Sequence, residues 1–195
     1  MAGSSSISNI QLFRWNIETN AFTHKNFYPK GNFKLEELSS PYYSSVFNGT
    51  MDHNHNYLVF AYLYFNHIDI IDIQQNKHQK RISLTLKEKI TIDIRNGNPN
   101  LAENKVFFTD IKITGSHIYV LEWGIDEYSM MEKEDSFPNL YVFTTKGEPV
   151  AKYRLDKKMF KFCVSPDGKS IFGITPVEEP NTPFVKYTLH SSDIG

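Results

Sequence analysis

The sequence predicts an all-β fold built of four-stranded antiparallel sheets of the β-propeller type, about three and a half of them. Helical periodicity is nearly absent along the chain. Short runs rich in Val, Ile, Phe, Tyr and Thr alternate with Asn, Gly, Pro and Asp clusters, which is the pattern of strands and hairpins. Two kinds of hairpin also recur in a fixed order.

The expected strands follow the apolar runs. The clearest of them are residues 57–64, 67–73, 106–113, 117–122, 139–144, 159–164, 169–175 and 184–189. Residues 33–38 are a weak candidate for a short helix.

One hairpin repeats along the chain. Residues 10–13, 68–71 and 140–143 superpose position by position, and residues 185–187 are a looser copy. A polar turn and another strand follow each of the first three copies. This is the self-similarity expected of a repeat architecture.

A second hairpin precedes the later copies. Residues 46–50, 110–113 and 160–164 each lead through a tight polar turn into an apolar strand. Together the two hairpins form a four-stranded unit, the blade of a propeller. With strands labelled a to d, the chain reads c-d, a-b-c-d, a-b-c-d, a-b-c.

The chain is expected to form a single partial propeller domain over residues 1–195. Residues 1–8 are expected to be a flexible tail or a remnant of cloning. The repeats are unevenly spaced, and the excess residues fall at 30–45 and at 124–138. We expect both stretches to be loop insertions, which in repeat proteins often carry function.

Composition excludes several classes of protein. The chain has 21 Lys and Arg residues and 22 Asp and Glu residues, so it lacks the excess of basic residues that is typical of nucleic-acid-binding proteins. The longest apolar run, residues 58–65, is far too short to cross a bilayer as a helix. Cys163 is the one cysteine, which rules out an intrachain disulfide, and its place between Phe162 and Val164 predicts a buried thiol.

The runs at residues 57–62 and 67–73 resemble the TolB-like six-bladed β-propeller proteins of bacterial cell envelopes. The same resemblance holds for residues 140–143 with 147–155, and for residues 172–173 with 185–189. It implies a propeller fold and a setting in the cell envelope or periplasm, and it transfers no catalytic residue. A ring of six blades needs about 250 residues, so the chain matches only the C-terminal part of such a propeller.

Three carboxylates are candidates for a site at the mouth of a central channel. Asp110, Glu122 and Asp126 lie at the ends of expected inner strands or in the loop that follows. Grouped there, they would hold a divalent cation or act as acid and base; the alternative is solvated charges at strand ends. Asp69 and Asp72 are expected to point outward from their strand.

His53 and His55 are weak candidates for metal ligands, because alternate residues of an extended segment share one side. The alternative is a polar hairpin turn. No cofactor is predicted beyond the divalent cation.

Trp123 stands at the start of the acidic insertion and is expected to be an accessible anchor for a ligand. The favoured function is therefore a non-catalytic binding module for a protein, peptide or glycan. The alternative is a propeller hydrolase or lactonase with a cation at the channel. Open blade edges predict self-association.

Overall fold

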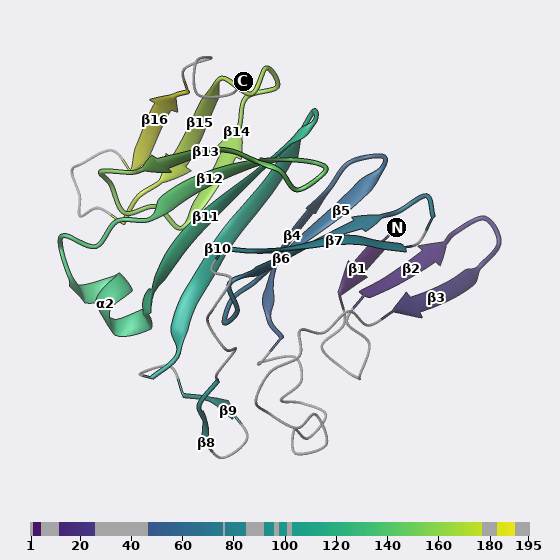
Figure 1. Ribbon diagram of the computed structural model, residues 1–195, viewed down its shortest axis with the longest axis horizontal. Helices are drawn as coiled ribbons and strands as arrows, with labels where there is room; N and C mark the ends of the chain where they lie inside the picture. The colour runs from purple at the N-terminus through teal and green to yellow at the C-terminus, as the bar shows by residue number, and fades with distance from the viewer. Residues whose placement is uncertain are drawn as a thin grey trace.

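The computed structural model describes residues 2–4, 12–25, 47–75, 77–84, 92–95, 98–100, 103–176 and 183–189. Four antiparallel sheets succeed one another in chain order and fan out from β1–β3 to β14–β16 (Figure 1). They contain three, four, four and three strands. We call them the first, second, third and last sheet.

Each sheet is a meander in which consecutive strands pair. The first sheet is β1 (Ala2–Ser4), β2 (Leu12–Asn16) and β3 (Ala21–Lys25). The second is β4 (Gly49–His53), β5 (Tyr57–Tyr62), β6 (His67–Asp72) and β7 (Lys77–Ser83). The third is β10 (Lys105–Thr114), β11 (His117–Asp126), β12 (Asn139–Thr144) and β13 (Pro149–Arg154). The last is β14 (Lys161–Val164), β15 (Ser170–Ile174) and β16 (Phe184–Thr188).

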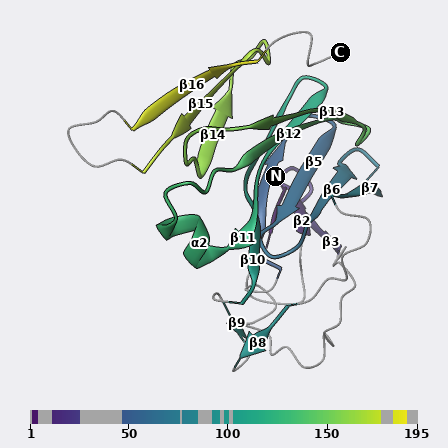
Figure 2. The ribbon, with the colours of Figure 1, turned by 60° about the vertical axis from the view of Figure 1, so that its left-hand side comes forward.

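Two smaller elements complete the described structure. A two-stranded ribbon pairs β8 (Ile94–Arg95) with β9 (Asn98–Pro99). The helix α2 (Glu127–Glu132) follows β11 directly and lies beside the end of that strand (Figure 2). The stretch 124–138 is thus partly strand and helix rather than loop. The expected helix at 33–38 and the insertion at 30–45 lie outside the described residues.

The predicted all-β fold and the order of its hairpins are confirmed, with two local differences. Ala2–Ser4 pairs with Leu12–Arg14, where a flexible tail was expected. Backbone hydrogen bonds can pair an edge strand without an apolar sequence pattern. β4 lies three residues later than expected, because the Asn54 side chain accepts hydrogen bonds from the backbone N–H groups of Asn56 and Tyr57 and so sets the turn.

The second sheet packs on the third, and the third on the last, through apolar side chains. We call the face turned to the preceding sheet the leading face and the face turned to the following sheet the trailing face. A buried cluster joins the second sheet to the third, and another joins the third to the last. The first of these clusters includes Val59, Ala61, Ile68, Ile70, Ile118, Val120 and Phe143; the second includes Tyr119, Leu121, Leu140, Val142, Phe162 and Ile171.

Two expectations about single side chains are wrong. Asp69 is fully buried, since the face of β6 opposite Ile68 and Ile70 is covered as well. Cys163 is exposed, because β14 alternates and turns Phe162 inward and Cys163 outward.

Candidate functional site

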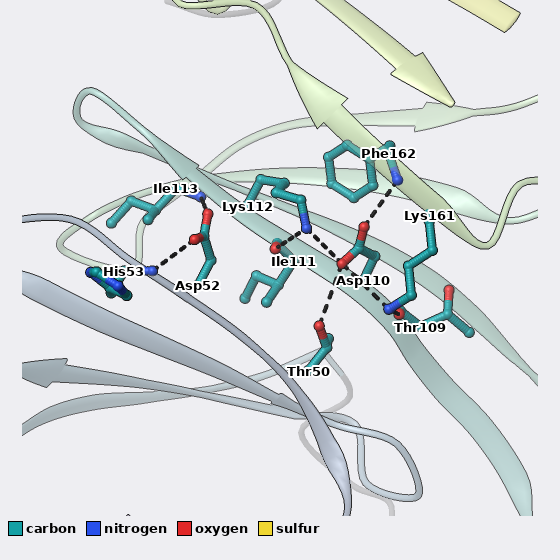
Figure 3. Close-up of polar contacts among 10 residues, drawn as sticks. All are labelled: Thr50, Asp52, His53, Thr109, Asp110, Ile111, Lys112, Ile113, Lys161 and Phe162. Atoms are coloured by element: carbon teal, nitrogen blue, oxygen red, sulfur yellow. Dashed lines mark hydrogen bonds and ion pairs between the residues drawn. The ribbon is translucent and has the colours of Figure 1, made fainter. Parts of the chain in front are cut away.

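The innermost strands of three successive sheets, β4, β10 and β14, meet around Asp110 (Figure 3). β10 follows the period of two, so Asp110 and Lys112 share one side of the strand while Ile111 and Ile113 point into the core on the other. This alternation places a carboxylate and an ammonium group together on the side of β10 away from Ile111 and Ile113.

Asp110 is buried, and its two oxygens are occupied. Oδ1 lies 2.7 Å from Lys112 Nζ and 3.7 Å from Lys161 Nζ. It also accepts a 3.4 Å hydrogen bond from Thr50 Oγ1 of β4. Oδ2 accepts the backbone N–H of Phe162 of β14 at 2.9 Å. Asp110 therefore ties three sheets together, and its charge is neutralised within the fold.

A second carboxylate joins the same strands from the other side. Asp52 Oδ2 accepts the backbone N–H of Ile113 at 2.8 Å, and its Oδ1 accepts the backbone N–H of His53. The buried Asp110 and the half-buried Asp52 thus accept hydrogen bonds from main-chain N–H groups of neighbouring sheets, which is a structural use of carboxylates.

Lys112 and Lys161 are the charged groups of this junction that reach solvent. Lys112 Nζ donates to the carbonyl of Ile111 and stands 5.6 Å from the centre of the Phe162 ring. Lys161 Nζ donates to the carbonyl of Thr109 at 2.9 Å. The two ammonium groups therefore balance the two carboxylates, Asp110 and Asp52.

The other two predicted carboxylates do not join Asp110. In the strand register Asp110 pairs with Leu121 and shares its face, so Glu122, the next residue, points to the opposite face of the sheet. Glu122 Oε2 accepts from Asn139 Nδ2 of β12 at 2.8 Å. Asp110 and Glu122 therefore do not form a carboxylate pair.

Asp126 has a local structural role. It is the N-cap of α2, and its Oδ1 accepts the backbone N–H of Ser129 at 2.8 Å. These hydrogen bonds to Ser129 lower the pKa of Asp126 below its usual range.

The expectation that Trp123 is accessible is wrong. Its side chain is buried and stacks on the ring of Phe160, with the ring centres 5.1 Å apart. β11 runs on to Asp126, so Trp123 lies inside a strand and packs beneath the insertion rather than at its surface.

His53 and His55 are both exposed, at the end of β4 and in the turn that follows. Among the residues with described positions, no group of three or more His, Cys, Asp or Glu side chains is arranged to hold a metal ion.

The exposed apolar side chains of the acidic insertion lie on α2. Tyr128 is 69% exposed and Met131 is 52% exposed. They stand three positions apart and so lie on one side of the helix. The helix itself is fixed: Met130 is buried in the core, and Ser136 Oγ donates to the carbonyls of Ser129 and Lys133.

Acidic side chains surround this pair. Glu132, Glu134 and Asp135 are exposed, with Lys133 as the one basic residue among them. Met130 of α2 and Tyr64 belong to one buried cluster, so α2 lies beside the second sheet. Burial raises the pKa of the Tyr64 hydroxyl, and the charge of Glu127 raises it further. We call Tyr128, Met131 and these acidic residues the α2 ledge.

Sequence reasoning missed Lys112, Lys161 and Thr50 at the Asp110 junction. For Lys112 a signal was present, since residues 110 and 112 are alternate residues of one predicted strand. Lys161 and Thr50 come from other sheets, at sequence distances of about fifty residues or more, and only the packing of sheets brings them to Asp110.

Successive antiparallel meanders of three or four strands, with the first strands β4, β10 and β14 of three of them side by side, define a protein of the β-propeller class. A sequence profile described as "TolB-like 6-blade propeller-like" matches residues 7–167. The chain belongs to this TolB-like family.

Solved structures similar to the chain have little sequence in common with it. The WD40 domain of Toxoplasma gondii coronin is 10% identical, with a TM-score of 0.49 over 89% of this chain and 36% of that one. A Bacteroides caccae protein of unknown function is 9% identical, with a TM-score of 0.44 over 97% and 58%. BamB from Moraxella catarrhalis is 13% identical, with a TM-score of 0.28 over 66% and 40%.

The chain thus spans between about a third and three fifths of the length of these structures. No curated protein matches its sequence. Within the described parts of the chain, no helix has the length and apolar character needed to cross a bilayer.

Proposed function

We propose that the chain is a non-catalytic binding module that holds a protein or peptide partner on the α2 ledge. The observation that carries this proposal is the exposure of Tyr128 and Met131 on a helix that the buried side chains of Ser129 and Met130 hold in place. A rigid apolar pair loses little conformational entropy on binding, and aromatic and Met side chains are frequent interface anchors.

The acidic surroundings favour a basic partner. Glu132, Glu134 and Asp135 outnumber Lys133 and Lys158, whose Nζ donates to the carbonyl of Met131. A segment with Lys or Arg next to an aliphatic residue would therefore meet both properties. This preference favours a peptide over a neutral glycan. Membership in the TolB-like family supports a setting in the cell envelope.

The structural contacts of the three candidate carboxylates favour a binding function over a catalytic one. Asp110 is neutralised between sheets, Glu122 accepts from Asn139, and Asp126 caps α2. Each has a structural partner that accounts for its position.

The proposal is tested by panning a display library of random peptides on the wild-type chain, with the Tyr128→Ser/Met131→Ser variant as counter-selection. We expect enrichment of peptides that combine Lys or Arg with aliphatic residues, and at least about a ten-fold weaker binding of these peptides to the variant. A Phe172→Ser variant, changed at another exposed aromatic residue, is the matched control and should bind as wild type.

Peptides that bind the wild type and the double variant equally would refute the α2 ledge as the site. Failure to enrich any peptide would refute the proposed ligand class.

A further inference from the structure

Two neighbouring methionines of α2 lie in opposite environments. Met131 is 52% exposed, whereas Met130 is 7% exposed and belongs to the buried cluster that also includes Tyr64 and Trp123. Consecutive residues of a helix are turned by about 100° from each other, so their side chains point in different directions. A reagent in solution therefore meets one of these two thioethers and not the other.

The other methionines of the described residues are shielded as well. Met159 is fully buried in the cluster that joins the third sheet to the last, and Met51 packs against the cluster of Met130. Within the part of the chain that the structure describes, Met131 is thus the one exposed methionine. Oxidation of methionine in this part of the folded chain should therefore begin on α2.

The thioether of Met131 is open to reaction with a peroxide. In this reaction the sulfur attacks one oxygen atom of hydrogen peroxide, the O–O bond breaks and an S–O bond forms. The hydrogen on the transferred oxygen passes to the departing hydroxide, which leaves as water. The sulfur loses two electrons and the peroxide gains them, so no further reactant is required. The product is methionine sulfoxide, which is polar and which sulfoxide reductases convert back to methionine.

The surroundings of Met131 permit this reaction without disturbing the helix. Glu132, Glu134 and Asp135 are exposed beside it, and their negative charge does not repel hydrogen peroxide, which is uncharged. Lys158 Nζ donates to the carbonyl of Met131 at 2.7 Å, and this contact holds the backbone of the residue and not its side chain. The sulfur can therefore be oxidised while α2 keeps its place.

Oxidation places a polar group on the apolar part of the α2 ledge. That part consists of Tyr128 and Met131, and the sulfoxide oxygen replaces some of its apolar surface. Against an aliphatic residue of a bound peptide this oxygen has no donor, and burial of a polar group without a hydrogen bond is unfavourable. The effect on binding rests on the function proposed above, whereas the selectivity of oxidation does not.

We propose that Met131 is a reversible oxidation site that controls the α2 ledge. A peroxide converts its thioether to the sulfoxide, and the bound peptide is released. Reduction of the sulfoxide restores binding. Met130, one residue away, stays reduced because the core covers it.

The first measurement is the rate of oxidation at each methionine. The full chain is treated with hydrogen peroxide, the reaction is stopped with catalase at intervals, and the digested peptides are analysed by tandem mass spectrometry. We expect Met131 to be oxidised at least about ten-fold faster than Met130 in the folded chain. In urea, where the fold no longer shields Met130, the two rates should become similar. Equal rates at the two residues in the folded chain would overturn the proposal.

The second measurement is the affinity of the peptides selected on the reduced chain. It uses the Cys163→Ser variant, because Cys163 is exposed on the trailing face of the last sheet and also reacts with peroxide. Peroxide treatment should weaken binding at least about ten-fold, and methionine sulfoxide reductases that act on both epimers should restore it. Circular dichroism confirms that the oxidised chain is folded.

Met131→Leu in the same background is the matched variant, since it keeps an apolar side chain of similar size and removes the sulfur. Its affinity after peroxide treatment is compared with its own affinity before treatment, and the two should be equal. A loss in this variant as large as that in the Cys163→Ser chain would assign the effect to another residue and overturn the proposal.

Two further outcomes would overturn it. They are an unchanged affinity when Met131 is fully oxidised, and a loss of affinity that the reductases do not reverse. A reduced chain that binds no peptide would refute the proposed function and the release step with it, while the mass spectra decide separately whether Met131 is an oxidation site.

Discussion

Arg81 of β7 holds both carboxylate oxygens of Asp69 of β6, with Nε 2.6 Å from Oδ1 and Nη2 2.6 Å from Oδ2. The Tyr62 hydroxyl donates to the same Oδ2 at 2.7 Å. Asp69 is buried while Arg81 is a quarter exposed, so the guanidinium covers a charge that the second sheet encloses. Bidentate geometry of this kind makes the pair strong and directional.

Replacing Arg81 should destabilise the fold because it leaves the Asp69 carboxylate buried without its cation. We expect Arg81→Ala to lower the free energy of unfolding by about 3 kcal/mol, measured by urea denaturation. Lys77→Ala, at an exposed basic residue of the same strand, is the control and should change it by less than about 0.5 kcal/mol. An equal loss in both variants would contradict the structural role of the pair.

Asp110 should stabilise the packing of the sheets that it connects. Asp110→Ala leaves Lys112 without its counter-ion and the Phe162 N–H without an acceptor, which should cost about 3 kcal/mol of unfolding free energy. Asp110→Asn keeps an acceptor for Phe162 and should cost less. Lys161→Ala should cost under about 1 kcal/mol, since that lysine is exposed and 3.7 Å away. An Asp110→Ala variant as stable as wild type would show that the junction does not join the sheets.

His67 should make stability depend on pH. Partial burial lowers the pKa of His67 below its usual range, with the nearby Arg81 adding to this effect, and Ser83 Oγ lies 3.1 Å from Nδ1. The unfolded chain therefore binds a proton at higher pH than the folded chain does. The stability that the neutral His67 imidazole contributes is fully present above the pKa of His67 in the unfolded chain. It is lost as pH falls from about 7 to about 5.

His67→Gln should flatten that part of the stability curve, as measured by urea denaturation at a series of pH values. His53→Gln, at an exposed histidine, should leave it unchanged. The same slope in His67→Gln and wild type would assign the pH dependence to other groups.

Gly49 should not accept a side chain. A Cβ there would lie 2.2 Å from the carbonyl oxygen of Ala61 and 2.8 Å from the Phe60 ring, and the first of these is backbone that cannot move aside alone. Gly49→Ala should cost about 1–3 kcal/mol, seen as a lower Tm. Gly115→Asn is the control: nothing lies within 4 Å, and Asn tolerates its φ of +59°. A Tm equal to that of wild type would show that β4 can shift.

The order of strands was predictable from the sequence because each hairpin repeats a local pattern. Alternation and turn residues are properties of neighbouring positions, so the a-b-c-d units could be assigned without knowing what packs against them. The prediction gave the second and third sheets a fourth strand and the last sheet three strands. The structure has β7 and β13 as these fourth strands and three strands in the last sheet.

The site was less predictable because its residues depend on contacts between sheets. A period of two puts Asp69 on the face opposite Ile68, yet only the covering of that face determines whether it is buried. Trp123 was misplaced for a related reason: β11 extends to Asp126, where a loop was expected after Gly124. The α2 ledge fell within the expected insertion, but the helix that orders it was not foreseen.

The two buried clusters that join the second, third and last sheets each lie between one pair of neighbours. Cooperativity therefore passes only from one sheet to the next, as in a linear chain of coupled units. The third sheet is joined to a neighbouring sheet on each of its faces. The amides of β11 and β12 should accordingly be among the slowest to exchange with solvent.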